Sequence, residues 1–114
     1  MTPDIRNIQA DLPTALTGEQ FETLVRSDHV RIERIVSHGQ ATPAGEWLDQ
    51  GQDEWVMLLT GAAVVLFDGD TAPHRLVNGD HLLIPARCRH RVEWTASDCD
   101  TVWLAIHFPS TQIP

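Results

Sequence analysis

The amino-acid sequence predicts an all-β domain, built as a small antiparallel β-barrel and preceded by one short helix. Three observations support this fold class. Short segments rich in β-branched and apolar residues follow one another from residue 30 to residue 108. Turn sequences separate these segments at intervals of about 8–12 residues, which is typical of antiparallel sandwiches and barrels. Apolar residues recur at helical spacing near residue 20.

Residues 1–28 are expected to form an N-terminal arm that contains the short helix, and residues 29–114 the barrel, within one domain. Residues 1–16 contain prolines and show no apolar periodicity. The segment Thr17-Gly-Glu-Gln20 fits a capping box, which satisfies free backbone N–H groups at the start of a helix. Phe21, Leu24 and Val25 follow at helical spacing, so we predict a helix over about residues 18–26.

The rest of the chain is predicted to form strands at residues 30–37, 54–59, 62–67, 75–77, 81–84, 90–94 and 101–108. Residues 38–45 contain glycine and proline and are expected to form a loop. Asp68-Gly69-Asp70 and Asn78-Gly79-Asp80 are strong turn sequences. The strand at residues 54–59 is apolar on both faces. One face would fill the barrel, and the other would pack on the N-terminal arm or on a second subunit, so we expect a homodimer.

Composition and charge restrict the classes of partner. The chain has 114 residues, room for one domain, and 42% of them are hydrophobic, which is typical of a globular core. Its net charge is −8, and such an acidic chain repels nucleic acid and anionic membranes, so neither is an expected partner. No apolar run approaches the roughly 20 residues of a membrane helix. The N-terminus lacks the apolar segment of a signal peptide, so we expect a cytoplasmic protein.

Arg87, Arg89 and Arg91 form the one local cluster of positive charge. Two interpretations are open. The arginines can pair with acidic residues on the rim of the barrel. Alternatively, they can attract an anionic small molecule, because the planar guanidinium group fits a carboxylate or a phosphate.

Two stretches go beyond a general β pattern. The first is Glu54-Trp-Val-Met-Leu-Leu-Thr-Gly61, and the second is Gly79-Asp-His-Leu-Leu-Ile-Pro-Ala-Arg-Cys-Arg-His90. Seventeen residues separate Gly61 from Gly79. In this order and spacing, the pair resembles the two signature motifs of the cupin superfamily, over about residues 30–108. The amino-acid sequences of residues 30–37, 47–50, 53–56 and 90–95 resemble those of an uncharacterised subgroup of small single-domain bacterial cupins.

The resemblance implies a jelly-roll-like barrel in which two His and one Glu of the first motif and one His of the second motif hold a metal ion. Glu54 and His90 match the Glu and the second-motif His. The two first-motif histidines do not match, because the corresponding positions hold other residues at either spacing of the motif: Leu48 and Gln50, or Trp47 and Asp49. Arg87 stands where the family has a glycine.

A metal site would therefore need further ligands besides Glu54 and His90. The candidates for a third ligand are Gln50, Asp49 and His107, and such a mixed nitrogen and oxygen set would suit a divalent Fe, Mn, Ni or Zn ion. The alternative is a metal-free pocket in which Glu54 and His90 form a hydrogen-bonded pair, since a buried carboxylate needs a cation, a donor or water.

Three functions remain open at this level. The first is a small cupin that binds a divalent metal, a small organic ligand or both, with an unassigned activity and no assigned catalytic residue. If it is an enzyme, its metal would polarise an oxygen atom of the ligand or bind O₂. The second is a metal-free binding module, and the third is a structural homodimer with a vestigial site. In the first two cases we expect Trp47, Arg87 and Trp103 to line the ligand pocket.

Overall fold

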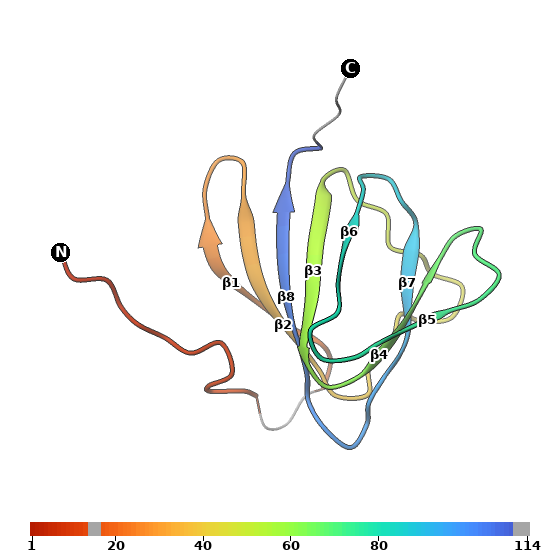
Figure 1. The fold of residues 1–114 in the computed structure, drawn as a ribbon, viewed down its shortest axis with the longest axis horizontal. Helices are drawn as coiled ribbons and strands as arrows, with labels where there is room; N and C mark the ends of the chain where they lie inside the picture. The colour runs from red at the N-terminus through yellow and green to blue at the C-terminus, as the bar shows by residue number, and fades with distance from the viewer. Residues whose placement is uncertain (14–16, 111–114) are drawn as a thin grey trace.

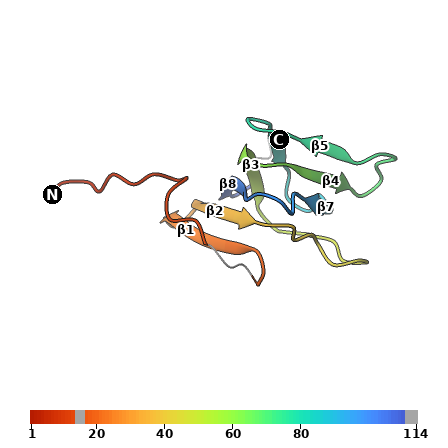
Figure 2. The ribbon, with the colours of Figure 1, turned by 90° about the horizontal axis from the view of Figure 1, so that it is seen from below.

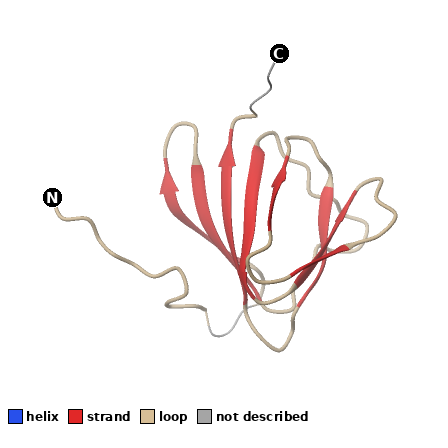
Figure 3. Ribbon diagram, viewed as in Figure 1, coloured by secondary structure: helices blue, strands red, loops and turns tan. Residues whose placement is uncertain are grey.

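The computed structural model describes residues 1–13 and 17–110 and consists of β-strands and loops (Figure 1). Its strands are β1 (Gln20–Arg26), β2 (Arg31–Ser37), β3 (Asp53–Thr60), β4 (Ala63–Phe67), β5 (His74–Leu76), β6 (His81–Ile84), β7 (His90–Thr95) and β8 (Thr101–Phe108). Strands and loops alone appear in Figure 3, and the described residues include no helix that is long and apolar enough to span a membrane.

The strands form two antiparallel sheets. One has five strands in the order β1-β2-β8-β3-β6, and the other has three in the order β5-β4-β7. Figure 2 shows β4 and β5 in a layer apart from β1 and β2. The all-β prediction is therefore confirmed, and each predicted strand is present to within one residue at either end. The closed barrel is not supported, because the described strands divide into two separate sheets.

The predicted helix at residues 18–26 is wrong, because most of this segment forms β1 at the edge of the larger sheet. β1 pairs with β2 in antiparallel register, with Phe21 opposite Ile35 and Val25 opposite Ile32. The apolar spacing of Phe21, Leu24 and Val25 fits a helix, but pairing with β2 supplies the backbone hydrogen bonds of a strand. β-Branched Thr23 and Val25 also favour an extended chain.

The first part of the N-terminal arm, residues 1–13, extends away from the two sheets in Figures 1 and 2, and Arg34 fastens it to β2. The guanidinium group of Arg34 donates to the backbone oxygens of Ile8 at 3.1 Å, Ala10 at 2.7 Å and Asp11 at 3.4 Å. Arg34 also pairs with Glu22 of β1 at 3.2 Å. Arg34 is buried, so these contacts supply partners for its charge while they hold the arm.

The apolar core lies between the two sheets. Its buried members come from β3, β4, β5, β6 and β8: Val56, Leu58, Ala63, Val65, Leu76, Ile84, Trp103 and Ala105. Successive side chains of a strand point to opposite faces of a sheet, so residues two apart share a face. This spacing places Trp103 and Ala105 of β8 on the face that looks toward the smaller sheet. The same face carries His107, which brings a polar side chain to one end of the core.

Candidate functional site

A cavity of about 500 Å³ lies between the two sheets. Side chains two residues apart on five strands line it: Glu33 and Ile35, Glu54 and Val56, Val65 and Phe67, Leu82 and Ile84, and His90 and Val92. On β8, Trp103 and His107 line it from positions four apart, which also share a face. The loop between β2 and β3 adds residues 41–43 and 46–50, and Glu19 and Phe21 close the edge near β1. The period of two along each strand is therefore what gathers these side chains around one space.

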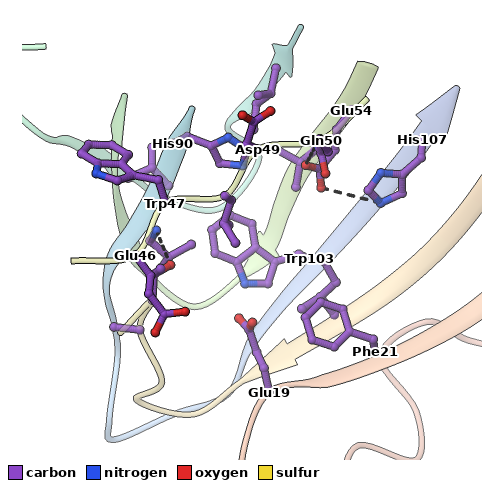
Figure 4. Close-up of a pocket in the computed structure, with 18 of the residues that line it drawn as sticks. Glu19, Phe21, Glu46, Trp47, Asp49, Gln50, Glu54, His90, Trp103 and His107 are labelled. Atoms are coloured by element: carbon purple, nitrogen blue, oxygen red, sulfur yellow. Dashed lines mark hydrogen bonds and ion pairs between the residues drawn. The ribbon is translucent and has the colours of Figure 1, made fainter. Parts of the chain in front are cut away.

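At one end of the cavity, four polar side chains form a chain of contacts, which we call the inner polar cluster: Glu33, His107, Glu54 and Gln50. Figure 4 shows the last three of them. His107 Nε2 donates to Glu33 Oε1 at 2.9 Å and lies 3.8 Å from Glu54 Oε2. Gln50 Nε2 donates to Glu54 Oε1 at 2.7 Å. Glu54 and His107 are direct neighbours across β3 and β8, so the sheet register itself brings them together.

The inner polar cluster is largely removed from water. The side chains of Glu33, Glu54 and His107 are each about a tenth exposed or less. A buried carboxylate is costly unless it accepts hydrogen bonds, and here two carboxylates share one imidazole and one amide donor. Arg31 Nε adds a charge partner for Glu33 at 3.6 Å. These contacts fix the orientation of the two carboxylates toward the cavity.

His90 lines the cavity from the smaller sheet. Its backbone pairs with Leu48 in both directions, with N···O distances of 2.7 and 3.0 Å, which fastens the loop before β3 to β7. The ring Nδ1 lies 2.9 Å from the backbone oxygen of Cys88, so Nδ1 carries the proton and donates it. In the neutral ring, Nε2 is then left as a hydrogen-bond acceptor.

The other end of the cavity holds Trp103 and Glu19. Trp103 is 5% exposed, and its indole N–H is buried with no hydrogen-bond partner in the described part of the chain. Figure 4 shows this nitrogen on the ring edge that faces Glu19. Burial raises the pKa of the Glu19 carboxyl above its ordinary value, and a hydrogen bond donated by Ser37 Oγ opposes that rise.

Most of the residues predicted from the sequence lie on the cavity wall. Trp47, Trp103, Asp49 and Gln50 all line it, together with Glu54, His90 and His107. Arg87 does not. Its guanidinium group is 74% exposed and lies 3.5 Å from the Asp49 carboxylate at the rim. The backbone of Arg87 has φ 66°, the left-handed conformation that glycine adopts most easily, and its N–H donates to the backbone oxygen of Gln50.

The three clustered arginines pair with acidic residues, as the first interpretation of the sequence proposed. Besides Arg87 with Asp49, Arg89 lies 3.3 Å from Asp68. Arg91 lies 3.0 Å from Glu93 and also donates to backbone oxygens of the loop at residues 42–46. The guanidinium groups of Arg89 and Arg91 also lie 5.5 and 6.0 Å from the centre of the Trp47 ring. Arg89 and Arg91 therefore contact the Trp47 ring without lining the cavity themselves.

The side chains present do not fit the metal centre that the cupin resemblance implies. Metal centres in proteins ordinarily have at least three protein ligands, and Glu54 with His90 supplies two. Among the other candidates, His107 Nε2 is hydrogen-bonded to Glu33, and Asp49 pairs with Arg87 at the rim. Gln50 turns its amide NH2 toward Glu54 and would offer only a neutral carbonyl oxygen, and Leu48 has no donor atom. Within residues 1–13 and 17–110, no group of three or more His, Cys, Asp or Glu side chains is arranged to hold a metal ion.

Sequence reasoning did not predict several residues of the cavity wall, among them Glu19, Phe21, Glu33 and Glu46. Glu33 was within reach of the sequence, because it lies two residues before Ile35 and so shares its face of β2. Glu19 and Phe21 could not be placed while their segment was interpreted as a helix.

The sequence matches no protein-family model and no curated protein. The fold, however, is similar to that of many solved structures. A protein of Ralstonia eutropha JMP134, whose assignment as a mannose-6-phosphate isomerase is provisional, is 47% identical with a TM-score of 0.92, covering 95% of this chain and 100% of that one.

Two more distant structures show the same fold. A cupin superfamily protein of Desulfitobacterium hafniense DCB-2 is 22% identical with a TM-score of 0.70, covering 87% of this chain and 84% of that one. An RmlC-like cupin family protein of Methanocaldococcus jannaschii, with a double-stranded β-helix fold, is 17% identical with a TM-score of 0.71, covering 96% and 94%.

Proposed function

The chain belongs to the cupin superfamily, and we propose that it binds a small organic molecule in the cavity between its two sheets without the help of a metal ion. One observation carries this proposal: apolar walls enclose about 500 Å³ and end in the inner polar cluster. Binding sites for small molecules ordinarily measure roughly 300–1,000 Å³ and combine apolar walls with a few fixed polar groups.

Each part of the wall has a distinct task in this proposal. Val56, Val65 and Ile84 exclude water from the apolar part of the ligand. Glu54 accepts a hydrogen bond from the ligand while Gln50 holds its carboxylate in place. His90 offers Nε2 as a second acceptor. Fixed acceptors of this kind set the orientation of a ligand, because their side chains do not have to be ordered when it binds.

The purely structural homodimer is less well supported than a binding module. A vestigial site would be free to fill with apolar side chains. Instead, Glu33, Glu54, His90 and His107 are all buried and all line an open space. Burying polar groups beside a cavity costs stability, so the arrangement favours a function that uses them.

The test is a small-molecule screen that observes the indole N–H signals of the protein by ¹H–¹⁵N NMR. Trp103→Phe identifies the Trp103 signal among those of the four tryptophans. We expect some compounds of the screen to shift this signal in a saturable way. Ile35→Phe narrows the cavity and should lower the affinity for those compounds by about tenfold or more, because the larger side chain occupies space that the ligand needs.

Ile32→Phe is the matched control, since Ile32 lies on β2 and is not among the residues that line the cavity. It should leave binding unchanged. Saturable binding that Ile32→Phe and Ile35→Phe weaken equally would place the ligand elsewhere. A screen without any saturable shift of the Trp103 signal would contradict the proposed function.

We also propose that the chain forms a homodimer through β1. β1 is the outer strand of the five-stranded sheet, so one of its edges has no strand partner among the described residues. Phe21 and Val25 on this strand are 61% and 52% exposed. An open strand edge with exposed apolar side chains is prone to pair with another chain, and a second β1 would cover both features at once.

A further inference from the structure

The charge of the cavity wall indicates which class of ligand it takes. Five carboxylate side chains line the cavity (Glu19, Glu33, Glu46, Asp49 and Glu54), against one guanidinium group, that of Arg31. The formal charge of the wall is therefore −4 with His90 and His107 neutral, and −2 with both protonated. A cavity lined by charges of one sign raises the local concentration of ligands of the opposite charge and repels ligands of the same charge.

Positive charge from the rest of the chain offsets this charge at the rim, where Arg87 pairs with Asp49, but Arg89 and Arg91 pair with Asp68 and Glu93, which do not line the cavity. Arg87, Arg89 and Arg91, the clustered arginines near the loop before β3, do not line it. Each is already paired with a carboxylate, at 3.5, 3.3 and 3.0 Å respectively. A phosphate or carboxylate ligand would thus enter a space in which Arg31 is the one guanidinium partner, and Arg31 already lies 3.6 Å from Glu33.

A second, independent feature points to an oxygen atom on the ligand. The Trp103 side chain lines the cavity, and its buried indole N–H has no hydrogen-bond partner among the described residues. An indole N–H can donate but cannot accept, so only an acceptor atom satisfies it. An unsatisfied buried donor is unfavourable, and a ligand oxygen at this end of the cavity would remove that cost.

We propose that the cavity takes a small organic amine that also carries a hydroxyl or carbonyl oxygen, and that it excludes phosphorylated molecules. This inference rests on the proposed function. The ammonium group lies against the inner polar cluster, where Glu54 is fixed by Gln50. The oxygen accepts from Trp103 at the other end, and the apolar walls contact the carbon skeleton between them (Figure 4). A sugar phosphate, as in the provisional name of the Ralstonia eutropha protein, is the opposite kind of ligand.

The experiment compares ligands that share a skeleton and differ in charge. One set is tyramine, tyrosol and 3-(4-hydroxyphenyl)propionate, and the second is mannosamine, mannose and mannose 6-phosphate. Each compound is titrated into the full chain while the Trp103 indole signal is followed. We expect the amine of at least one set to bind about tenfold or more tightly than its neutral counterpart, with the anion weakest, and salt to reduce the difference.

Two variants test whether Glu54 is the main partner of the ammonium group of the ligand. Glu54→Gln keeps the shape of the side chain and should bring the affinities of amine and neutral ligand to within about threefold of each other, because the main partner of the ammonium group is gone. Asp49→Asn, at the rim beside Arg87, is the control and should keep most of the selectivity.

Every outcome of this comparison decides the inference. Equal or tighter binding of the neutral or anionic member would overturn it and leave the proposed function standing. Binding of neither set, while other compounds of the screen do bind, would also overturn it. If no compound of any charge binds, both proposals fail. Amine selectivity that Glu54→Gln leaves intact would refute the role of the inner polar cluster.

Discussion

The imidazole Nε2 of His107 lies 2.9 Å from the carboxylate of Glu33, although the two are 74 positions apart in the chain. β2 and β8 are neighbours in the five-stranded sheet, and the cross-strand register places Arg31 opposite His107 and Glu33 opposite Ala105. Glu33 and His107 are thus diagonal neighbours on one face of the sheet. This contact joins β2 to β8, the last strand in the chain, and bounds the cavity at its polar end.

Loss of His107 should destabilise the protein strongly. His107→Phe leaves Glu33 and Glu54 buried without their shared donor, and breaking a buried pair costs about 3–5 kcal/mol. Urea denaturation should show this loss. Adding Glu33→Leu to His107→Phe should restore about 1–3 kcal/mol, because the two residues interact directly. The control is His74→Phe, which removes an exposed pair with Asp70 and should change stability by less than about 0.5 kcal/mol. Equal losses for the two histidines would contradict the role of the buried pair.

Removal of metal ions should leave stability unchanged. If a metal held at a hundredfold excess over its Kd stabilised the native state, it would contribute about 2.7 kcal/mol. For a domain of this size that is roughly 10–20 °C in melting temperature, at about 4–8 °C per kcal/mol. We expect chelator to shift the melting temperature by less than about 1 °C, which is well below that range. A fall of ten degrees would contradict the metal-free site.

Glu54→Gln should be neutral or stabilising by up to about 1 kcal/mol. The change removes one of two buried carboxylates that share His107, while the side-chain oxygen can still accept from Gln50. Thermal unfolding in the absence of ligand measures the effect. A loss above about 2 kcal/mol would indicate that the charge of Glu54 has a favourable partner in the native state, such as a cation.

Glu19→Gln should stabilise the protein near neutral pH and have less effect near pH 4. Burial raises the folded-state pKa of Glu19 above its ordinary value of 4.5, so folding favours the protonated form. The corresponding stability is present below the unfolded-state pKa and is lost as the pH rises through the folded-state pKa. The amide remains neutral throughout and avoids this loss. Melting temperatures of both proteins across this range test the prediction, and a gain that grows as the pH falls would contradict it.

Gly61→Ala should destabilise far more than Gly69→Ala. Both glycines have positive φ, 107° and 91°, so alanine at either position costs about 1–2 kcal/mol. At Gly61, a Cβ would also lie 2.6 Å from Thr101 Cα and 2.8 Å from the backbone oxygen of Asp100. At Gly69 it would meet open space. Forcing β3 and β8 apart should add roughly 1–3 kcal/mol, measurable by denaturant unfolding. Similar losses at both glycines would show that the close approach is relieved at no cost.

Light scattering at micromolar concentration should report about twice the chain mass of 12.7 kDa. Phe21→Lys on the open edge of β1 should shift the protein toward monomer, because a charge on an edge strand opposes pairing with another strand. Leu83→Lys is the control, since Leu83 is a similarly exposed apolar residue on β6 at the opposite edge of the sheet. If Leu83→Lys dissociates the dimer and Phe21→Lys does not, the interface lies at the other edge.

The sequence by itself determined the all-β class, the position of each strand from residue 30 onward, and the family. Period-two patterns and turn residues such as those around Gly69 and Gly79 are local signals, and they need no knowledge of the rest of the chain. The resemblance to the two cupin motifs, rather than a local pattern, implied that Glu54 and His90 share one site, and both line the cavity.

Only the tertiary structure decided that residues 20–26 form a strand and which charged side chains line the cavity. Phe21 and Val25 have a spacing that suits a helix, and pairing with β2 overrode it. The neighbours of Glu33 and the direction of Arg87 depend on which strands lie side by side, and contacts between residues 74 positions apart leave no trace in a local pattern. The charge of the cavity follows from those contacts, because a carboxylate or guanidinium contributes to it only if the fold turns that side chain inward.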